Sequence, residues 1–164
     1  MPIQKPIDAL IFDWGDTVMR DFGAPGPMAE WETVQYIPGA DDALSTLSPR
    51  FTCIIATSAD HSGTEEMIAA LKRVKADRYF HHFFSSRDLG YKKPDPEFFR
   101  SIIRNVGLTP GRCVMIGNLY EKDILGAAKA GLQTILFDQH RHEGTYPEAD
   151  EIINHMKELP KLLT

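Results

Sequence analysis

Short apolar runs and amphipathic stretches alternate along this chain, and that alternation restricts the folds it can adopt. Each run is long enough for a buried strand and too short for a convincing helix. We predict strands at about residues 7–13, 51–56, 79–84, 113–116 and 133–137. We predict helices at about residues 28–36, 41–47, 63–76, 96–105, 121–130 and 152–159. Because strands that alternate with helices form parallel sheets through right-handed crossovers, the expected fold is α/β with a doubly wound parallel sheet.

Length and charge narrow the classes of protein further. The 164 residues are most simply one domain, residues 1–164, with enough chain for a proper core. The net charge is −5 and the Lys and Arg residues are scattered rather than gathered in a stripe. A nucleic-acid-binding domain usually carries a basic patch, so we expect no nucleic-acid partner.

The apolar runs and the two cysteines indicate where in the cell the protein is expected to be. No apolar run approaches the length of a membrane span, and the N-terminus lacks the pattern of a signal peptide. Cys53 and Cys113 each lie inside a predicted strand, without the spacing of a metal site, so we expect buried, reduced thiols. These features lead us to expect no membrane partner and a cytoplasmic location.

The first apolar run, Ala9 to Phe12, ends abruptly in Asp13, which is followed by Gly15 and Asp16. In an open parallel sheet, ligands bind beyond the carboxyl ends of the strands. A carboxylate at such an end is held where a substrate would arrive. Taken alone, however, this stretch favours the simpler interpretation, a strand followed by a turn that Asp13 merely caps.

Other predicted strands also end in polar groups, and this favours a functional role. The second strand is followed by Thr57 and Ser58, and the fourth by Asn118 with Asp123 close behind. Lys93 lies in the loop before a predicted helix. If the strands are parallel, these groups converge at one edge of the sheet. A carboxylate nucleophile, hydroxyls, an ammonium and a second acidic group suit phosphoryl transfer.

Four motifs give the chain a resemblance to the haloacid dehalogenase (HAD) superfamily, and most of all to its phosphatase-type members. They are DWGDT at residues 13–17, IIATS at 54–58, KPDP at 93–96 and GNLYEKDILGAAKAG at 117–131. Each motif alone is weak, but their order and spacing fit the superfamily over nearly the whole chain. The resemblance implies a Rossmann-like core and hydrolysis of a small phosphorylated metabolite through an aspartyl-phosphate.

The resemblance also implies roles for individual residues. Asp13 would be the nucleophile. Thr57 and Ser58 would bind the phosphoryl group, and Lys93 would balance the charge of nucleophile and phosphate. The cofactor would be Mg²⁺.

The implied ligands of that Mg²⁺ all carry oxygen, as this ion prefers. They are Asp13, the backbone carbonyl of Gly15, Asn118 and Asp123, the last directly or through water.

Two positions depart from the superfamily pattern. Its phosphatases carry an acid/base Asp two residues after the nucleophile, where this chain has Gly15 and the acid follows one position later, at Asp16. Neighbouring side chains point in different directions, so Asp16 is open to two interpretations, proton transfer or hydrogen bonding within the loop. The first acid of the fourth motif is replaced by Asn118, which removes one negative charge from the metal site. Both changes lower the expected rate of phosphoester hydrolysis.

These departures keep two alternative functions open. One is a catalytically weak or inactive HAD domain that binds or regulates. The other is a receiver-type phosphoacceptor module, although such modules carry the phosphorylated Asp at the third strand rather than the first.

The segments between the motifs are too short for a sizeable cap domain. We expect only a short flap insertion at about residues 18–37, which leaves the site open to solvent. A second copy of the chain is one way in which such a site could be covered. Phe22, Trp31 and Tyr36 of the flap are expected mainly to pack on the sheet edge, and His61, just past Thr57, to be a solvated loop residue.

Overall fold

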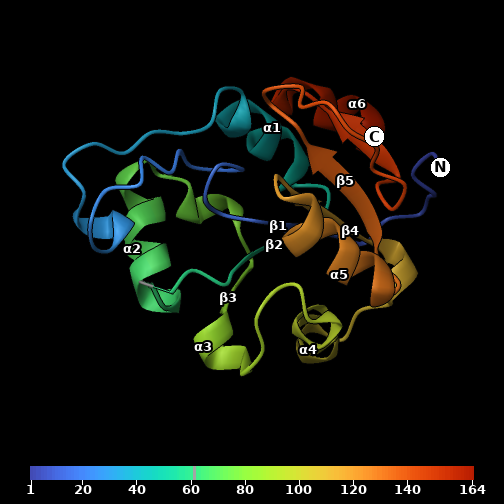
Figure 1. Cartoon of the computed structure of the whole chain (residues 1–164), viewed down its shortest axis with the longest axis horizontal. Coiled ribbons are helices and arrows are strands. Elements are labelled where there is room, and N and C mark those ends of the chain that lie inside the picture. The colour runs from blue at the N-terminus through green and yellow to red at the C-terminus, as the bar shows by residue number, and fades with distance from the viewer. Residues whose placement is uncertain (61) are drawn as a thin grey trace.

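The computed structural model describes residues 1–60 and 62–164, so His61 lies outside the described residues. One parallel sheet of six strands runs through the centre, in the order β3-β2-β1-β4-β5-β6 (Figure 1). The strands are β1 (Ala9–Phe12), β2 (Thr52–Thr57), β3 (His82–Ser85), β4 (Cys113–Gly117), β5 (Gln133–Phe137) and β6 (Glu151–Ile153). The helices are α1 (Ala40–Leu47), α2 (Thr64–Arg73), α3 (Ser86–Leu89), α4 (Pro96–Val106), α5 (Leu125–Lys129) and α6 (Leu159–Leu163).

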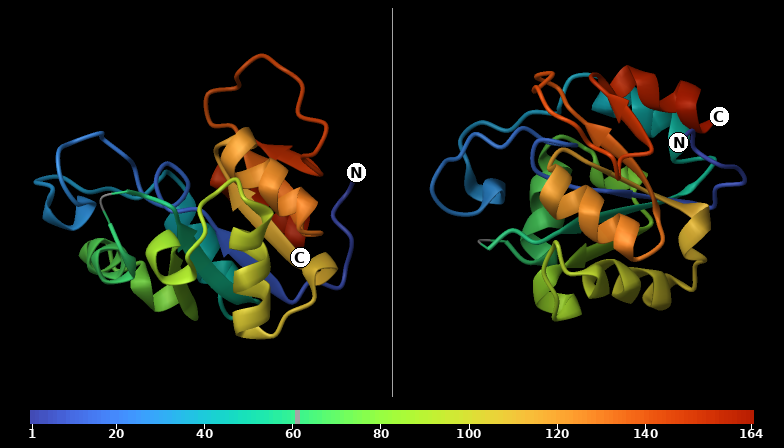
Figure 2. Two further views of the ribbon diagram at one scale, coloured as in Figure 1. Left: turned by 60° about the horizontal axis from the view of Figure 1, so that its bottom comes forward. Right: turned by 45° about the vertical axis from the view of Figure 1, so that its right-hand side comes forward.

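Helices cover both faces of the sheet, as the views in Figure 2 show. Buried side chains of α1, α2 and α6 pack on one face, and those of α4 and α5 pack on the other. Along β1 the side chains alternate between the two layers, with Leu10 and Phe12 in the first and Ala9 and Ile11 in the second. Both sides are therefore apolar, which explains the continuous apolar run. The predicted doubly wound α/β fold is confirmed.

Three short helical turns lie in the loops between these elements, at Met28–Glu30, Asp77–Tyr79 and Pro110–Arg112. Two further turns, Tyr120–Ile124 and Met156–Glu158, lead directly into α5 and α6. In the described part of the chain, no helix has both the length and the apolar character to cross a membrane. Cys53 and Cys113 are buried and unpaired, as predicted.

The helix predicted at residues 28–36 is wrong beyond its first turn. Only Met28–Glu30 is helical, and the backbone becomes extended at Trp31. The guanidinium of Arg73, from α2, donates to the carbonyl oxygens of Met28, Ala29 and Trp31. The Met28 carbonyl also accepts from the Trp31 amide at 3.1 Å, which closes the single turn, and Arg73 provides hydrogen bonds to carbonyls that a longer helix would otherwise satisfy.

The helix predicted at about 152–159 is wrong at its start. Residues Glu151–Ile153 form the sixth strand, in which Ile135 pairs with Glu151 and Phe137 with Ile153. Ile153 is buried whereas Ile152 is 45% exposed, which is the alternation of a strand. The helix α6 begins only at Leu159. Apolar residues at 152, 153, 156 and 159 fit helical spacing equally well, so periodicity alone could not separate the two.

Two further elements have different boundaries in the structure from those predicted. The third strand lies at His82–Ser85 rather than 79–84, and the short helix α3 follows it without having been predicted. The segment after β4 opens with the wide turn Tyr120–Ile124 before α5, so the helix predicted at 121–130 is only partly regular.

The flap expected at about 18–37 is a loop whose two ends pair with each other. Met19 and Tyr36 form an antiparallel bridge, the amide of Arg20 donates to the Gln35 carbonyl at 2.9 Å, and that of Ile37 donates to Val18 at 2.9 Å. Among the described residues no large cap domain is evident.

Candidate active site

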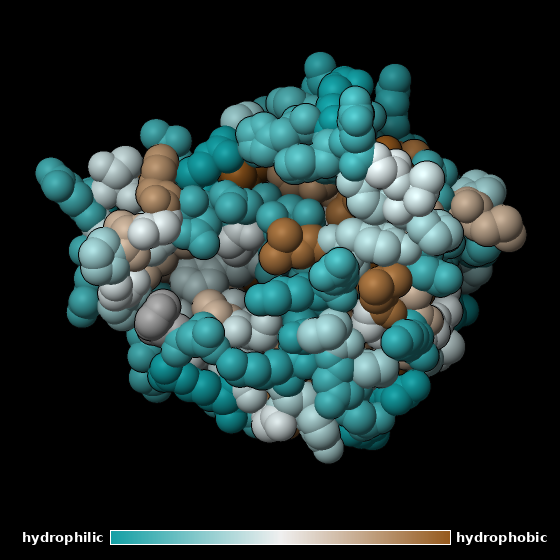
Figure 3. Space-filling model, viewed as in Figure 1, coloured by the Kyte–Doolittle hydropathy of each residue, from teal (hydrophilic) through white to brown (hydrophobic). Residues whose placement is uncertain are grey.

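A cavity of about 400 Å³ lies at the carboxyl edge of the sheet. Four segments contribute to its lining, three at the ends of strands and one from the flap. They are Asp13–Gly15 after β1, flap residues between Asp21 and Trp31, Thr57, Ser58, Ala59 and Ser62 at and beyond the end of β2, and Leu119, Lys122 and Asp123 after β4. Lys93 completes the lining. The face of the molecule drawn in Figure 3 is mostly hydrophilic, and its hydrophobic residues are scattered rather than gathered.

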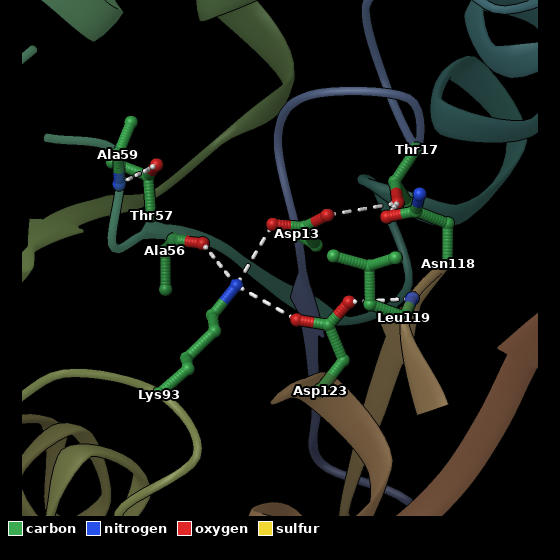
Figure 4. Close-up of polar contacts among 9 residues, drawn as sticks. All are labelled: Asp13, Thr17, Ala56, Thr57, Ala59, Lys93, Asn118, Leu119 and Asp123. Carbon is green, nitrogen blue, oxygen red and sulfur yellow. Dashed lines mark hydrogen bonds and ion pairs between the residues drawn. The ribbon is translucent and has the colours of Figure 1, made fainter. Parts of the chain in front are cut away.

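Lys93 lies at the centre of the site, between two carboxylates (Figure 4). Its Nζ is 2.8 Å from Oδ1 of Asp13 and 2.9 Å from Oδ1 of Asp123. It also donates to the Ala56 carbonyl at 3.2 Å. An ammonium has three protons, so these three acceptors use all of them. The geometry holds Asp13 in a single orientation at the floor of the cavity.

The positive charge of Lys93 offsets part of the negative charge of the two carboxylates beside it. Burial by itself would lower the pKa of Lys93, but the carboxylates of Asp123 and Asp13 outweigh it and raise that pKa above its usual range. Burial, and then the nearby charge of Asp13, raise the pKa of the Asp123 carboxyl. Lys93 therefore stays protonated at neutral pH and supplies the cation that the buried carboxylate of Asp123 and the partly buried one of Asp13 require.

The hydroxyl of Thr57 is buried at the end of β2, where the predicted phosphate site begins. Its Oγ1 accepts a hydrogen bond from the amide of Ala59 at 3.0 Å. Because the amide occupies a lone pair and not the proton, the hydroxyl proton stays available for an incoming anion. Ser58, half-buried, also lines the cavity. Thr57, Ser58, Asp13 and Lys93 are thus brought together as the sequence predicted.

Oxygen atoms also gather on the other side of Asp13. The Thr17 hydroxyl lies 3.2 Å from Oδ2 of Asp13 and 3.3 Å from Oδ1 of Asn118. These two oxygens belong to residues that follow the neighbouring strands β1 and β4, and both lie near the Thr17 hydroxyl (Figure 4). One carboxylate and one amide oxygen are hard donors that suit Mg²⁺, which readily keeps waters as further ligands. This donor set fits the predicted cofactor.

Asp123 is placed differently from Asn118. Its Oδ1 faces Lys93, and its Oδ2 accepts from the amide of Leu119 at 3.0 Å. Both oxygens already have partners in the protein. Within the described residues, no group of three or more His, Cys, Asp or Glu side chains is arranged to hold a metal. A metal here would therefore depend on the single carboxylate of Asp13, on the amide oxygen of Asn118, on backbone carbonyls and on water.

Asp16 is not brought into the cavity of Asp13. It has a left-handed backbone with φ of 59°, and its Oδ1 accepts from the amide of Asp21 at 2.9 Å. With Asn118 it lines a second, adjoining cavity of about 280 Å³. Of the two interpretations of Asp16, the contacts are those of hydrogen bonding within the loop.

Sequence reasoning gave no site role to several residues that line the cavity, among them Asp21, Trp31 and Lys122. Asp21 belongs to the flap, and Lys122 belongs to the turn before α5. Trp31, also in the flap, was expected mainly to pack on the sheet edge. The Trp31 indole donates to the carbonyl of Gly26 at 3.0 Å, which fixes the ring within the flap. No periodic pattern marks these residues, because an irregular loop places them.

The loop that carries Lys93 is packed against α5 at Gly126. A Cβ at Gly126 would overlap the carbonyl oxygen of Pro94 and lie 2.8 Å from Cε2 of Phe99. We expect Gly126→Ala to lower the free energy of unfolding by about 1–3 kcal/mol, as overpacking does, and to displace Lys93. Urea unfolding measures the first effect. Gly111→Ala is the matched control, since a Cβ there meets nothing within 4 Å. Equal stability of the two variants would contradict the close approach.

The comparisons with known proteins agree with this geometry. The family model for haloacid dehalogenase-like hydrolases matches residues 25–131, which contain the second, third and fourth motifs. The glyceraldehyde 3-phosphate phosphatase of Methanothermobacter thermautotrophicus is 40% identical over 76 residues, which are 44% of this chain and 32% of that protein. Its counterpart in Pyrococcus furiosus is 28% identical over 130 residues, 77% of this chain and 52% of that protein.

Solved structures agree in fold. A HAD phosphatase from Thermococcus onnurineus superposes with a TM-score of 0.79 at 20% identity, covering 96% of this chain and 98% of that one. The chain spans a third to about half of the curated relatives it matches. The family match covers well over half of this chain, and the predicted resemblance is confirmed: the chain belongs to the haloacid dehalogenase-like hydrolases.

Proposed function

We propose that this protein is a Mg²⁺-dependent phosphatase that hydrolyses a small phosphorylated metabolite through an aspartyl-phosphate on Asp13. The observation that carries the proposal is the contact of Lys93 with both Asp13 and Asp123 at the floor of the cavity. A buried cation held between two carboxylates contributes little to stability compared with an apolar core, so the cluster is better explained by catalysis. Relatives named as glyceraldehyde 3-phosphate phosphatases support the same class of reaction.

In the first half-reaction, a carboxylate oxygen of Asp13 attacks phosphorus and the ester oxygen departs. Lys93 donates a hydrogen bond to Asp13 and lies where negative charge accumulates on the transferring group. The Thr57 hydroxyl donates its proton to a phosphoryl oxygen, and Ser58 lies next to it. Water then attacks the acyl phosphate, which returns Asp13 to its starting state and releases inorganic phosphate.

Mg²⁺, when bound, would neutralise part of the phosphoryl charge. The proposed ligands are Asp13, the Gly15 carbonyl and Asn118, with Asp123 acting through water. Asn118 already lies beside Asp13 through their shared contact with Thr17. Replacing a carboxylate by an amide leaves a weaker metal site, so we expect a higher Mg²⁺ requirement than a two-carboxylate site would have.

The size of the cavity favours a small substrate. At about 400 Å³ it is at the lower end of ordinary small-molecule pockets. The flap supplies part of the wall through Met28 and Trp31, and Lys122 adds a cation to the lining. We infer a phosphorylated sugar or hydroxy-acid fragment rather than a polymer.

The test is hydrolysis of a panel of small alkyl phosphates and an aryl phosphate, with Mg²⁺ and after removal of metal by EDTA. We expect release of phosphate that falls at least about tenfold in EDTA and returns when Mg²⁺ is added back. A 2-haloacid is included, because some solved structures of this fold are dehalogenases.

Two results would reject the proposal. Halide release without phosphatase activity would place the chain with the dehalogenases. Absence of turnover together with absence of Mg²⁺ binding by calorimetry would favour the inactive domain, for which Gly15 and Asn118 are the sequence evidence.

A further inference from the structure

The position two residues after the nucleophile has no side chain, but it is not surrounded by empty space. A Cβ at Gly15 would lie 3.6 Å from Cβ and 3.7 Å from Oδ2 of Asp21. Asp21 and Gly15 line the same cavity as Asp13. The carboxylate of Asp21, which comes from the flap, therefore lies beside the place that an acidic side chain at residue 15 would occupy.

The backbone and one oxygen of Asp21 are held in place. Its amide donates to Oδ1 of Asp16 at 2.9 Å, and its own Oδ1 accepts from the amide of Gly23 at 2.8 Å. Its Oδ2 accepts no hydrogen bond from the described residues. One oxygen thus anchors the carboxylate while the other is available to a substrate or a water molecule.

We propose that Asp21 is the general acid and base of this enzyme, in place of the acid that is missing at Gly15. The proposal rests on the phosphatase function proposed above. Asp16, the displaced acid of the first motif, is then a positioning residue, which holds the amide of Asp21 and does not exchange protons with the substrate.

The proton transfers balance over the two half-reactions. As Asp13 bonds to phosphorus and the bond to the ester oxygen breaks, the protonated Asp21 gives its proton to that oxygen, and the alcohol leaves. The Asp21 carboxylate then takes a proton from water, whose oxygen bonds to phosphorus. The bond between phosphorus and Asp13 breaks, its electron pair returns to Asp13, and Asp21 is again protonated.

The presence of Asp21 also accounts for the absence of an acidic side chain at residue 15. Two carboxylates at positions 15 and 21 would face each other at close range and repel. A side chain at position 15 is otherwise tolerated, because a Cβ there makes only ordinary van der Waals contact and the backbone is not left-handed. Glycine at 15 is therefore not required by the turn. It is compatible with an acid that comes from the flap.

The first test compares Asp21→Asn with the parent on an alkyl phosphate and on 4-nitrophenyl phosphate. We expect kcat on the alkyl ester to fall about 10²–10³-fold, as loss of a general acid and base does. Nitrophenolate leaves without a proton, so on the aryl ester the variant should release one equivalent rapidly and then turn over slowly. Asp42→Asn, an exposed acid that lines neither cavity, is the control.

The second test moves the acid. The double variant Gly15→Asp/Asp21→Ala should be at least about tenfold more active than Asp21→Ala. Gly15→Asp alone should be less active than the parent, because its two carboxylates repel each other. Asp16→Asn keeps an oxygen that can accept from the Asp21 amide and should lose much less than Asp16→Ala.

The results separate this inference from the function on which it rests. If the parent hydrolyses phosphate esters and Asp21→Asn keeps more than about half of its kcat on the alkyl ester, Asp21 is not the acid. If Asp16→Asn and Asp16→Ala fall equally, and by as much as Asp21→Asn, then Asp16 carries the proton. If the parent has no phosphatase activity in Mg²⁺, both proposals are wrong.

Discussion

Asp13→Asn is expected to abolish phosphate release, with a fall in kcat of more than about 10⁴-fold on every substrate that the parent accepts. An amide oxygen does not attack phosphorus as a carboxylate does, so the covalent intermediate cannot form. The fold should survive, because an Asn oxygen can still accept from Nζ of Lys93, and Asp123 remains as its charged partner. Activity and stability are therefore expected to separate in this variant.

Steady-state kinetics and thermal unfolding on the same preparation measure both quantities. A third measurement, acid quench after mixing with radiolabelled aryl phosphate, should trap label on the parent and none on Asp13→Asn. Asp42→Asn again serves as the control for a lost exposed carboxylate. Mg²⁺-dependent turnover by Asp13→Asn above about a hundredth of the parent rate would show that another group is the nucleophile.

The placement of Asp13 was predictable because the causes are local. The apolar run Ala9–Phe12 forms β1, and the parallel register pairs Phe12 with Ile55 and with Ile116. The residues after each of these strands must then lie at the same edge of the sheet. That reasoning also places Thr57, Asn118 and, through the following turn, Asp123. It does not depend on any long-range contact that the sequence hides.

The placement of Asp21 was not predictable in this way. Residues 20–27 are rich in Gly and Pro, so no strand or helix pattern constrains them. The flap is held by contacts with distant groups, such as Arg73 from α2, which donates to the carbonyl oxygens of the following residues Met28, Ala29 and Trp31. The one local signal was the displaced acid at Asp16, whose Oδ1 accepts a hydrogen bond from the amide of Asp21 in the folded chain.

The parallel order of the sheet also removes an alternative. A receiver-type module carries its phosphorylated Asp at the third strand, whereas Asp13 ends β1, which lies between β2 and β4. The topology, like the family match, therefore separates this chain from such modules.

Lys93→Met is expected to cost about 3–5 kcal/mol of the free energy of unfolding, as removal of one partner from a buried ion pair does. The side chains of Lys93 and Asp123 are only 2% and 1% exposed, so water cannot replace the lost ammonium. Activity should be lost as well, because Asp13 loses both its orientation and its neutralising charge. Urea unfolding and phosphate release measure the two losses.

The neighbouring lysine provides the matched control. Lys92 pairs with Asp60, but both of these side chains are more than half exposed. Lys92→Met should therefore unfold close to the parent, since exposed pairs contribute little. If Lys92→Met and Lys93→Met lost the same stability, the buried cluster would not be the cause.

The pH dependence of the loss identifies its origin. Burial and the charge of Asp13 already raise the pKa of Asp123, and removing Lys93 takes away the main group that opposes this rise. An acid whose pKa is higher in the folded state than in the unfolded chain destabilises the fold as pH rises through that folded pKa. Lys93→Met should thus be closest to the parent in acid and lose most at alkaline pH. Adding Asp123→Asn should restore part of the stability at neutral pH without restoring activity. A loss that does not vary with pH would point to packing instead of charge.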